Sequence, residues 1–220
     1  MRFDIVKVVN SVSPSYEDVN SEIIELKRSY PSLSNKGLSK KFTKKLRNKY
    51  TSVGVGSALP SVIPGLGTAA QIAVEAGTIS ADLALMLRWM GTMCYGVGII
   101  NGKDMSKEFN QDFIRILGIW SGVIMAAKEA TKRIGTKVAV AQFNRHVSGK
   151  VLQKINQRVG TTIVTKYGAK RGGIALGKLI PFGVGAAVAG TFNYSTMNSF
   201  GKAARKHYET NYDDDFIIVK

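Results

Sequence analysis

Two carboxylates of this 220-residue chain, Glu75 and Asp82, have a spacing that could support catalysis. With Gln71 and Thr78 they recur at helical intervals on an otherwise apolar segment, so they would form one polar stripe along a helix. Carboxylates two turns apart could bind a metal ion or act as a general acid and a general base. No histidine-rich motif accompanies them, and we favour polar contacts between core helices, with Arg88 as a partner.

The segment from Gly172 to Leu179 nearly matches the phosphate-binding loop G-x-x-x-x-G-K-S/T. Leu179 occupies the position whose hydroxyl group should bind Mg²⁺, and no clear strand precedes the segment. Gly173 and Gly177 instead have the small-xxx-small spacing that lets two helices approach closely. We therefore expect helix packing here rather than nucleotide binding.

The single cysteine and the two histidines are isolated in the sequence. Cys94 cannot form an internal disulfide or a cysteine-based zinc site, and it has no recognisable histidine partner, so a buried structural thiol is expected. His146 and His207 stand alone in basic surroundings. We expect no cofactor, no metal site and no defined catalysis.

Positive charge is the strongest functional signal. The chain has 31 Lys and Arg against 15 Asp and Glu, a formal net charge of +16. Residues 27–49 hold nine basic side chains and no acid, and residues 128–178 hold twelve with only Glu129. These blocks carry +9 and +11, which together exceed the charge of the whole chain. Such clustering forms a surface for an anionic partner, either phospholipid headgroups or nucleic acid.

Residues 36–50 have a helical periodicity that separates apolar from basic side chains. An apolar stripe recurs every four residues through Leu38, Phe42, Leu46 and Tyr50. Basic side chains cover the rest of the helix: Lys40, Lys41, Lys44, Lys45, Arg47 and Lys49. The stripe could lie in an anionic membrane or pack on the protein core, and both alternatives stay open. The candidate membrane contacts are Leu38, Phe42, Leu46 and these six cations, with Lys170, Arg171 and Lys178 of the second block.

Two long runs without charged residues, 50–74 and 179–201, approach the roughly 20 residues that span a bilayer. Prolines and polar residues interrupt both, and basic residues flank the second run on both sides, whereas spanning helices usually have asymmetric flanks. We expect buried or membrane-inserting helical hairpins. The runs share a proline followed by small residues, which predicts two helix starts packed together. The expected helix-packing residues are Pro64, Gly65, Gly67, Gly173, Gly177, Pro181, Gly183 and Gly185.

Helical periodicity dominates the chain and predicts a compact all-α fold. Ser15, with Asp18 three residues later, is the expected N-cap of the first helix. The acidic-apolar tail either docks as a short extended segment or stays loose. The expected helices are 15–30, 36–50, 67–100 with a break near Gly91 or Gly96, 104–134, 138–158, 161–167 and 181–208.

The glycine and proline motifs resemble those of the EcsC family of bacterial helical proteins. The resemblance rests on residues 53–67, on Glu75 and Asp82, on residues 179–187 and on Asn193, and it covers roughly 36–208. Residues 1–35 would then be an N-terminal helical extension and 209–220 a C-terminal tail. A helical domain attached to some bacterial membrane-associated GTPases is a competing match. The EcsC resemblance implies an all-helical protein, of a family often linked to membranes and transporter operons, without a settled activity or catalytic residues.

We therefore predict a protein that binds anionic lipid at the cytoplasmic face of a bacterial inner membrane, peripherally or partly inserted. The alternatives are a membrane-permeabilising toxin or defence effector, a hydrolase using Glu75 and Asp82, and a nucleic-acid-binding protein. The chain has no zinc-finger spacing and no RNP-like aromatic motif, which favours lipid over nucleic acid. A membrane protein or transporter as partner, and self-association, are further alternatives.

Overall fold

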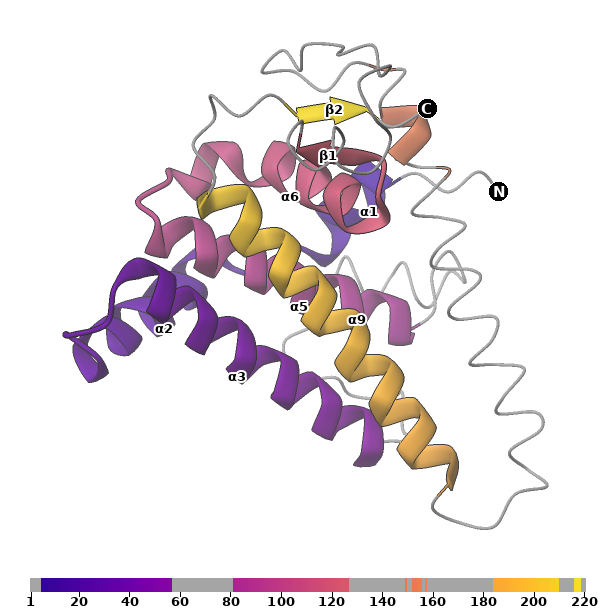
Figure 1. Ribbon diagram of the computed structural model, residues 1–220, viewed down its shortest axis with the longest axis horizontal. Coiled ribbons are helices and arrows are strands. Elements are labelled where there is room, and N and C mark those ends of the chain that lie inside the picture. The colour runs from indigo at the N-terminus through magenta and orange to yellow at the C-terminus, as the bar shows by residue number, and fades with distance from the viewer. Residues whose placement is uncertain are drawn as a thin grey trace.

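The computed structural model describes residues 5–56, 81–126, 149, 152–155, 157, 184–209 and 216–218, and it confirms the all-α fold (Figure 1). Two three-residue strands accompany the helices and pair antiparallel, with Ile124 opposite Ile218. The helices are α1 (Ile5–Val12), α2 (Tyr16–Ser29), α3 (Asn35–Gly56), α5 (Ala81–Ile100), α6 (Met105–Ser121) and α9 (Val184–Glu209), and the strands are β1 (Ile124–Ala126) and β2 (Phe216–Ile218).

The first predicted helix has the capping that the sequence indicated. The Ser15 hydroxyl accepts a hydrogen bond from the Asp18 backbone N–H at 3.2 Å, and α2 begins at Tyr16. The Ser34 hydroxyl caps α3 in the same way, accepting from the Gly37 N–H at 3.3 Å. Each hydroxyl satisfies a backbone donor that has no partner within the helix.

The α5 helix runs without a break through Gly91 and Gly96, so the expected interruption is wrong. Gly96 instead lies against the Phe42 ring of α3, where an added Cβ would lie only 2.0 Å from Phe42 Cε1. The missing side chain therefore lets α3 and α5 approach closely. Gly96 was expected to interrupt the helix, and it is instead a small residue at a helix contact.

The α6 helix ends at Ser121, so the predicted extension to Ile134 is wrong. Gly122 has a φ of 77°, and the Val123 N–H donates to the Gly118 carbonyl at 2.9 Å, which closes the helix end. The chain then enters β1, which pairs with β2. Of the two alternatives for the C-terminal tail, the extended docked segment is thus the one observed.

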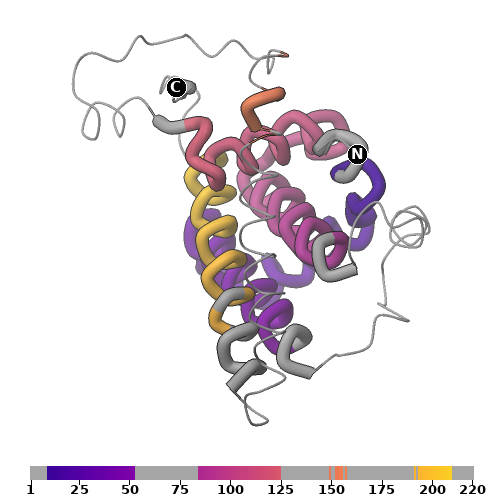
Figure 2. The backbone as a smooth tube through the Cα atoms, turned by 90° about the vertical axis from the view of Figure 1, so that its right-hand side faces the viewer, coloured from indigo at the N-terminus to yellow at the C-terminus, as the bar shows by residue number. Residues whose placement is uncertain are grey.

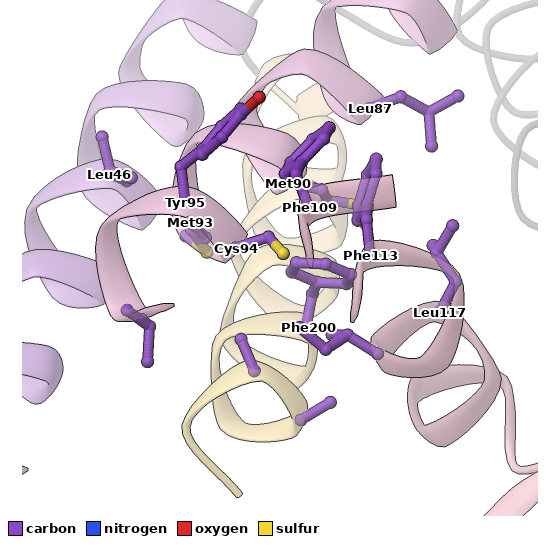
Figure 3. Close-up of a cluster of buried hydrophobic side chains, with 14 of the residues drawn as sticks. Leu46, Leu87, Met90, Met93, Cys94, Tyr95, Phe109, Phe113, Leu117 and Phe200 are labelled. Atoms are coloured by element: carbon purple, nitrogen blue, oxygen red, sulfur yellow. The ribbon is translucent and has the colours of Figure 1, made fainter. Parts of the chain in front are cut away.

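The hydrophobic core lies between α5, α6 and α9, with α3 beside α9 (Figures 1 and 2). The ring of Phe200 in α9 packs edge to face against the ring of Phe113 in α6, with 5.9 Å between the ring centres. Cys94 of α5 lies beside them (Figure 3). Val12 of α1 and Ile23 of α2 belong to the same buried cluster. Apolar burial from all six helices therefore holds one core together.

Several predicted packing residues fall outside the described residues. These are Pro64, Gly65, Gly67, Gly173, Gly177, Pro181 and Gly183. The α9 helix begins at Val184, near the expected start, and Gly185 lies in its first turn. The expected pairing of two proline-led helix starts stays a prediction.

We expect Gly96→Ala to lower the free energy of unfolding by about 1–3 kcal/mol, because the new methyl group would overpack against Phe42. Gly37→Ala is the matched control, since its added Cβ would lie at an ordinary 3.4 Å from Leu33 Cδ2. That change should be neutral or stabilising by up to about 1 kcal/mol through helix propensity. Denaturant unfolding of both variants measures the difference, and equal stabilities would contradict the α3–α5 contact.

Candidate functional site

The apolar stripe of α3 is part of the core. Leu38 is 4% exposed, Phe42 0% and Leu46 1%, and Tyr50 is buried beside them. The suggestion that Leu38, Phe42 and Leu46 contact the membrane is therefore wrong for this structure. Burying each such side chain against protein contributes about 1.5–3 kcal/mol, so moving the stripe into lipid would require the core to open.

Three lysines of α3 are on the opposite side and reach solvent. Lys36, Lys40 and Lys44 are exposed and follow one another at four-residue spacing, so they form one line along the helix. Lys49 is also exposed, but it lies about 140–180° around the helix from these three lysines. Among the described residues, no acidic side chain forms an ion pair with any of these four lysines. We refer to Lys36, Lys40 and Lys44 as the lysine face.

Two other cations of α3, Lys45 and Arg47, contact neighbouring helices. Lys45 forms an ion pair with Glu22 of α2 at 2.8 Å. Arg47 lies 4.1 Å from the centre of the Tyr194 ring of α9 and donates to Asn198 Oδ1 at 3.1 Å. These contacts orient α3 against α2 and α9, and they leave the lysine face free of the same constraints.

The α9 helix adds positive charge next to α3. Arg205 donates a hydrogen bond to the Thr43 hydroxyl of α3. Burial lowers the pKa of Arg205, Glu209 opposes this shift, and nearby Arg47 adds to it. A guanidinium group remains protonated at neutral pH despite such a shift, so the α3–α9 contact carries two neighbouring positive charges.

A buried charge cluster joins α6 and α9, and the sequence did not reveal it. Asp112 is 1% exposed, and its Oδ1 lies 3.1 Å from His207 Nε2 and 3.4 Å from Arg115 Nη1. The statement that His207 stands alone in basic surroundings is therefore wrong. One signal was present: Asp112 falls among the core-facing positions of α6, between Phe109 and Ile116.

Cys94 is fully buried, which confirms the predicted structural thiol. Its Sγ lies 3.4 Å from the Tyr208 hydroxyl, which donates to Met105 Sδ at 3.4 Å. Burial raises the pKa of Cys94 well above its usual value, and nearby Asp112 adds to the rise, whereas the Tyr208 hydrogen bond opposes it. The thiol therefore stays protonated and unreactive in the folded protein.

We expect stability to fall as the pH rises through about 9, because the unfolded chain loses the Cys94 proton while the folded protein keeps it. Each unit above the unfolded pKa costs about 1.4 kcal/mol per such group, until the folded pKa is reached. Burial raises the pKa of Tyr208 in the same direction. The free energy of unfolding from pH 8 to 10.5 should decline less steeply in Cys94→Ala than in the wild type, and parallel declines would contradict this account.

The predicted catalytic stripe is not assembled by the described residues. Glu75 lies outside them, and Asp82 lies in the first turn of α5, but its side chain is not among those that the structure describes. The described residues also exclude three candidate membrane contacts, Lys170, Arg171 and Lys178. Arg88, the expected partner of the stripe, instead donates to the Ser13 carbonyl at 3.1 Å. Within the described ranges, no group of three or more His, Cys, Asp or Glu is arranged to bind a metal.

Comparison with protein-family models, with curated proteins and with solved structures finds no match to this chain. The resemblance to the EcsC family therefore stays an expectation from the sequence. In the part of the chain that the structure describes, no helix is both long and apolar enough to cross a bilayer.

Proposed function

We propose that this protein binds anionic phospholipid headgroups through the lysine face of α3, as a peripheral protein of the cytoplasmic membrane surface. The observation that carries the proposal is the line of Lys36, Lys40 and Lys44, exposed and without acidic ion-pair partners among the described residues. Each lysine close to an anionic leaflet contributes about 1 kcal/mol of attraction. Three such charges together contribute about 3 kcal/mol, which supports reversible binding at moderate salt.

The burial of Leu38, Phe42 and Leu46 favours contact at the level of the headgroups, because α3 has no free apolar stripe to place in the acyl chains. The attraction should then be mainly electrostatic. Exposed charges lose their attraction when the Debye length shrinks from about 10 Å at 0.1 M salt to about 3 Å at 1 M. The EcsC resemblance, with its link to bacterial membranes and transporters, supports the same setting.

Fractionation of expressing bacterial cells tests this proposal. The protein should sediment with membranes and be released by a wash in 1 M salt. Resistance to both salt and alkaline carbonate would favour stable insertion and contradict peripheral binding. Recovery only in the soluble fraction, or release by nuclease treatment, would also overturn the proposal, the latter in favour of nucleic acid.

A further inference from the structure

The connection between α2 and α3 is an ordered corner at one extremity of the molecule (Figure 1). The Leu33 N–H donates to the Tyr30 carbonyl at 3.1 Å, which closes a turn. The Ser34 hydroxyl caps the following helix through the Gly37 N–H. The corner therefore has a defined shape rather than that of a loose linker.

Exposed apolar side chains are concentrated near this corner. Four large hydrophobic residues are exposed among those the structure describes, and three of them, Ile24, Tyr30 and Leu33, lie in α2 or the turn that follows it. Tyr30 and Leu33, in the turn itself, are each 38% exposed. Neighbouring exposed apolar side chains indicate a surface that contacts another molecule or a membrane.

Cations flank the turn on both sides in the sequence. Lys27 and Arg28 lie in the last turn of α2, and Lys36 and Lys41 lie in the first two turns of α3; all four are exposed. Lys41 Nζ lies 3.8 Å above the centre of the Tyr30 ring. The sequence has no acid from residue 26 to residue 74. The corner therefore joins a small apolar tip to cations from a stretch of sequence without acids.

An anionic bilayer surface matches both parts of this corner. Tyrosine is favoured at the membrane–water interface, because its ring is apolar and its hydroxyl is polar. Lysine and arginine bind the phosphates while their alkyl chains cover apolar surface. A nucleic-acid backbone would complement the cations but would leave Leu33 without an apolar partner.

We propose that the turn Tyr30–Ser34 is a membrane-insertion wedge, in which Tyr30 and Leu33 enter the headgroup region while Lys27, Arg28 and Lys36 bind lipid phosphates. This inference rests on the proposed lipid binding and adds an orientation to it. The N-terminal end of α3 faces the bilayer, and the lysine face extends the contact along the helix.

A fluorophore placed on the turn tests the wedge. Leu33→Cys is labelled with the environment-sensitive dye NBD, and Lys154→Cys, which is exposed on the segment packed against the end of α6, is the matched control. The buried Cys94 should take up no label, and labelling of the wild type checks this. When phosphatidylglycerol vesicles are added, the fluorescence emission of the dye at position 33 should shift to shorter wavelength and increase in intensity. The emission of the dye at position 154 should not change.

The unlabelled variant Leu33→Ser provides a second measurement that leaves the net charge unchanged. Its partition into the same vesicles should weaken by about five-fold, since part of a leucine side chain no longer leaves water. Ser32→Ala, in the same turn, should bind like the wild type. Vesicle binding without a dye shift at position 33, or with Leu33→Ser unaffected, overturns the wedge and leaves the proposed function standing. Absence of vesicle binding by every variant, the wild type included, overturns both.

Discussion

Replacing Asp112 with asparagine should lower the free energy of unfolding by about 3–5 kcal/mol. The carboxylate is 1% exposed and contacts both His207, 2% exposed, and Arg115, 12% exposed, so its loss removes the negative charge from a largely buried cluster. Asparagine keeps nearly the same volume, so the effect would come from charge rather than from a cavity. Denaturant unfolding at neutral pH measures it.

The exposed ion pair between Asp104 and Lys107, at the start of α6, offers a matched control. Their nitrogen–oxygen distance is 3.3 Å, but the two side chains are 51% and 82% exposed. Asp104→Asn should therefore change the free energy of unfolding by less than about 1 kcal/mol. If the two variants proved equally stable, the buried cluster would not be what holds α6 against α9.

Reversing two charges on the lysine face should produce the second large effect. Each lysine near an anionic surface contributes about 1 kcal/mol, and a glutamate in its place is repelled by a similar amount. The double variant Lys40→Glu/Lys44→Glu should thus bind anionic vesicles about 10³-fold more weakly, a change of about 4 kcal/mol. Co-sedimentation with phosphatidylglycerol vesicles measures this, and the exposed positions should leave the fold intact.

The control for charge is Lys107→Glu/Lys154→Glu, which changes the net charge equally but alters neither α3 nor α9. Both lysines are exposed. This variant should retain most of the vesicle binding, because its altered charges lie outside the lysine face. Equal loss in the two double variants would mean that net charge alone, and no particular surface, determines binding.

The local features of the fold were predictable from sequence because they depend on neighbouring residues. Ser15 caps α2 as its spacing to Asp18 indicated. The four-residue repeat through Leu38, Phe42 and Leu46 identified a buried stripe, although the sequence could not decide between a protein core and a membrane. That decision depended on α5 and α9, which supply the surface that covers the stripe.

The contacts that the sequence missed join residues far apart in the chain. Asp112 and His207 lie 95 positions apart, and no local pattern links an acid on α6 to a histidine near the end of α9. The end of α6 was missed for a different reason. Apolar residues continue after Ser121, but Gly122 adopts a left-handed conformation that ends the helix, and the following residues form β1.

The lysine face should recognise an anionic membrane rather than any polyanion. The most direct test compares the binding of the wild-type protein to phosphatidylglycerol vesicles, phosphatidylcholine vesicles and duplex DNA, at equal phosphate concentration and at 0.1 M and 1 M salt. We expect the tightest binding to phosphatidylglycerol vesicles at 0.1 M salt, near loss of binding at 1 M, and little binding to phosphatidylcholine. Equal binding to both lipids, or tighter binding to DNA, would contradict it.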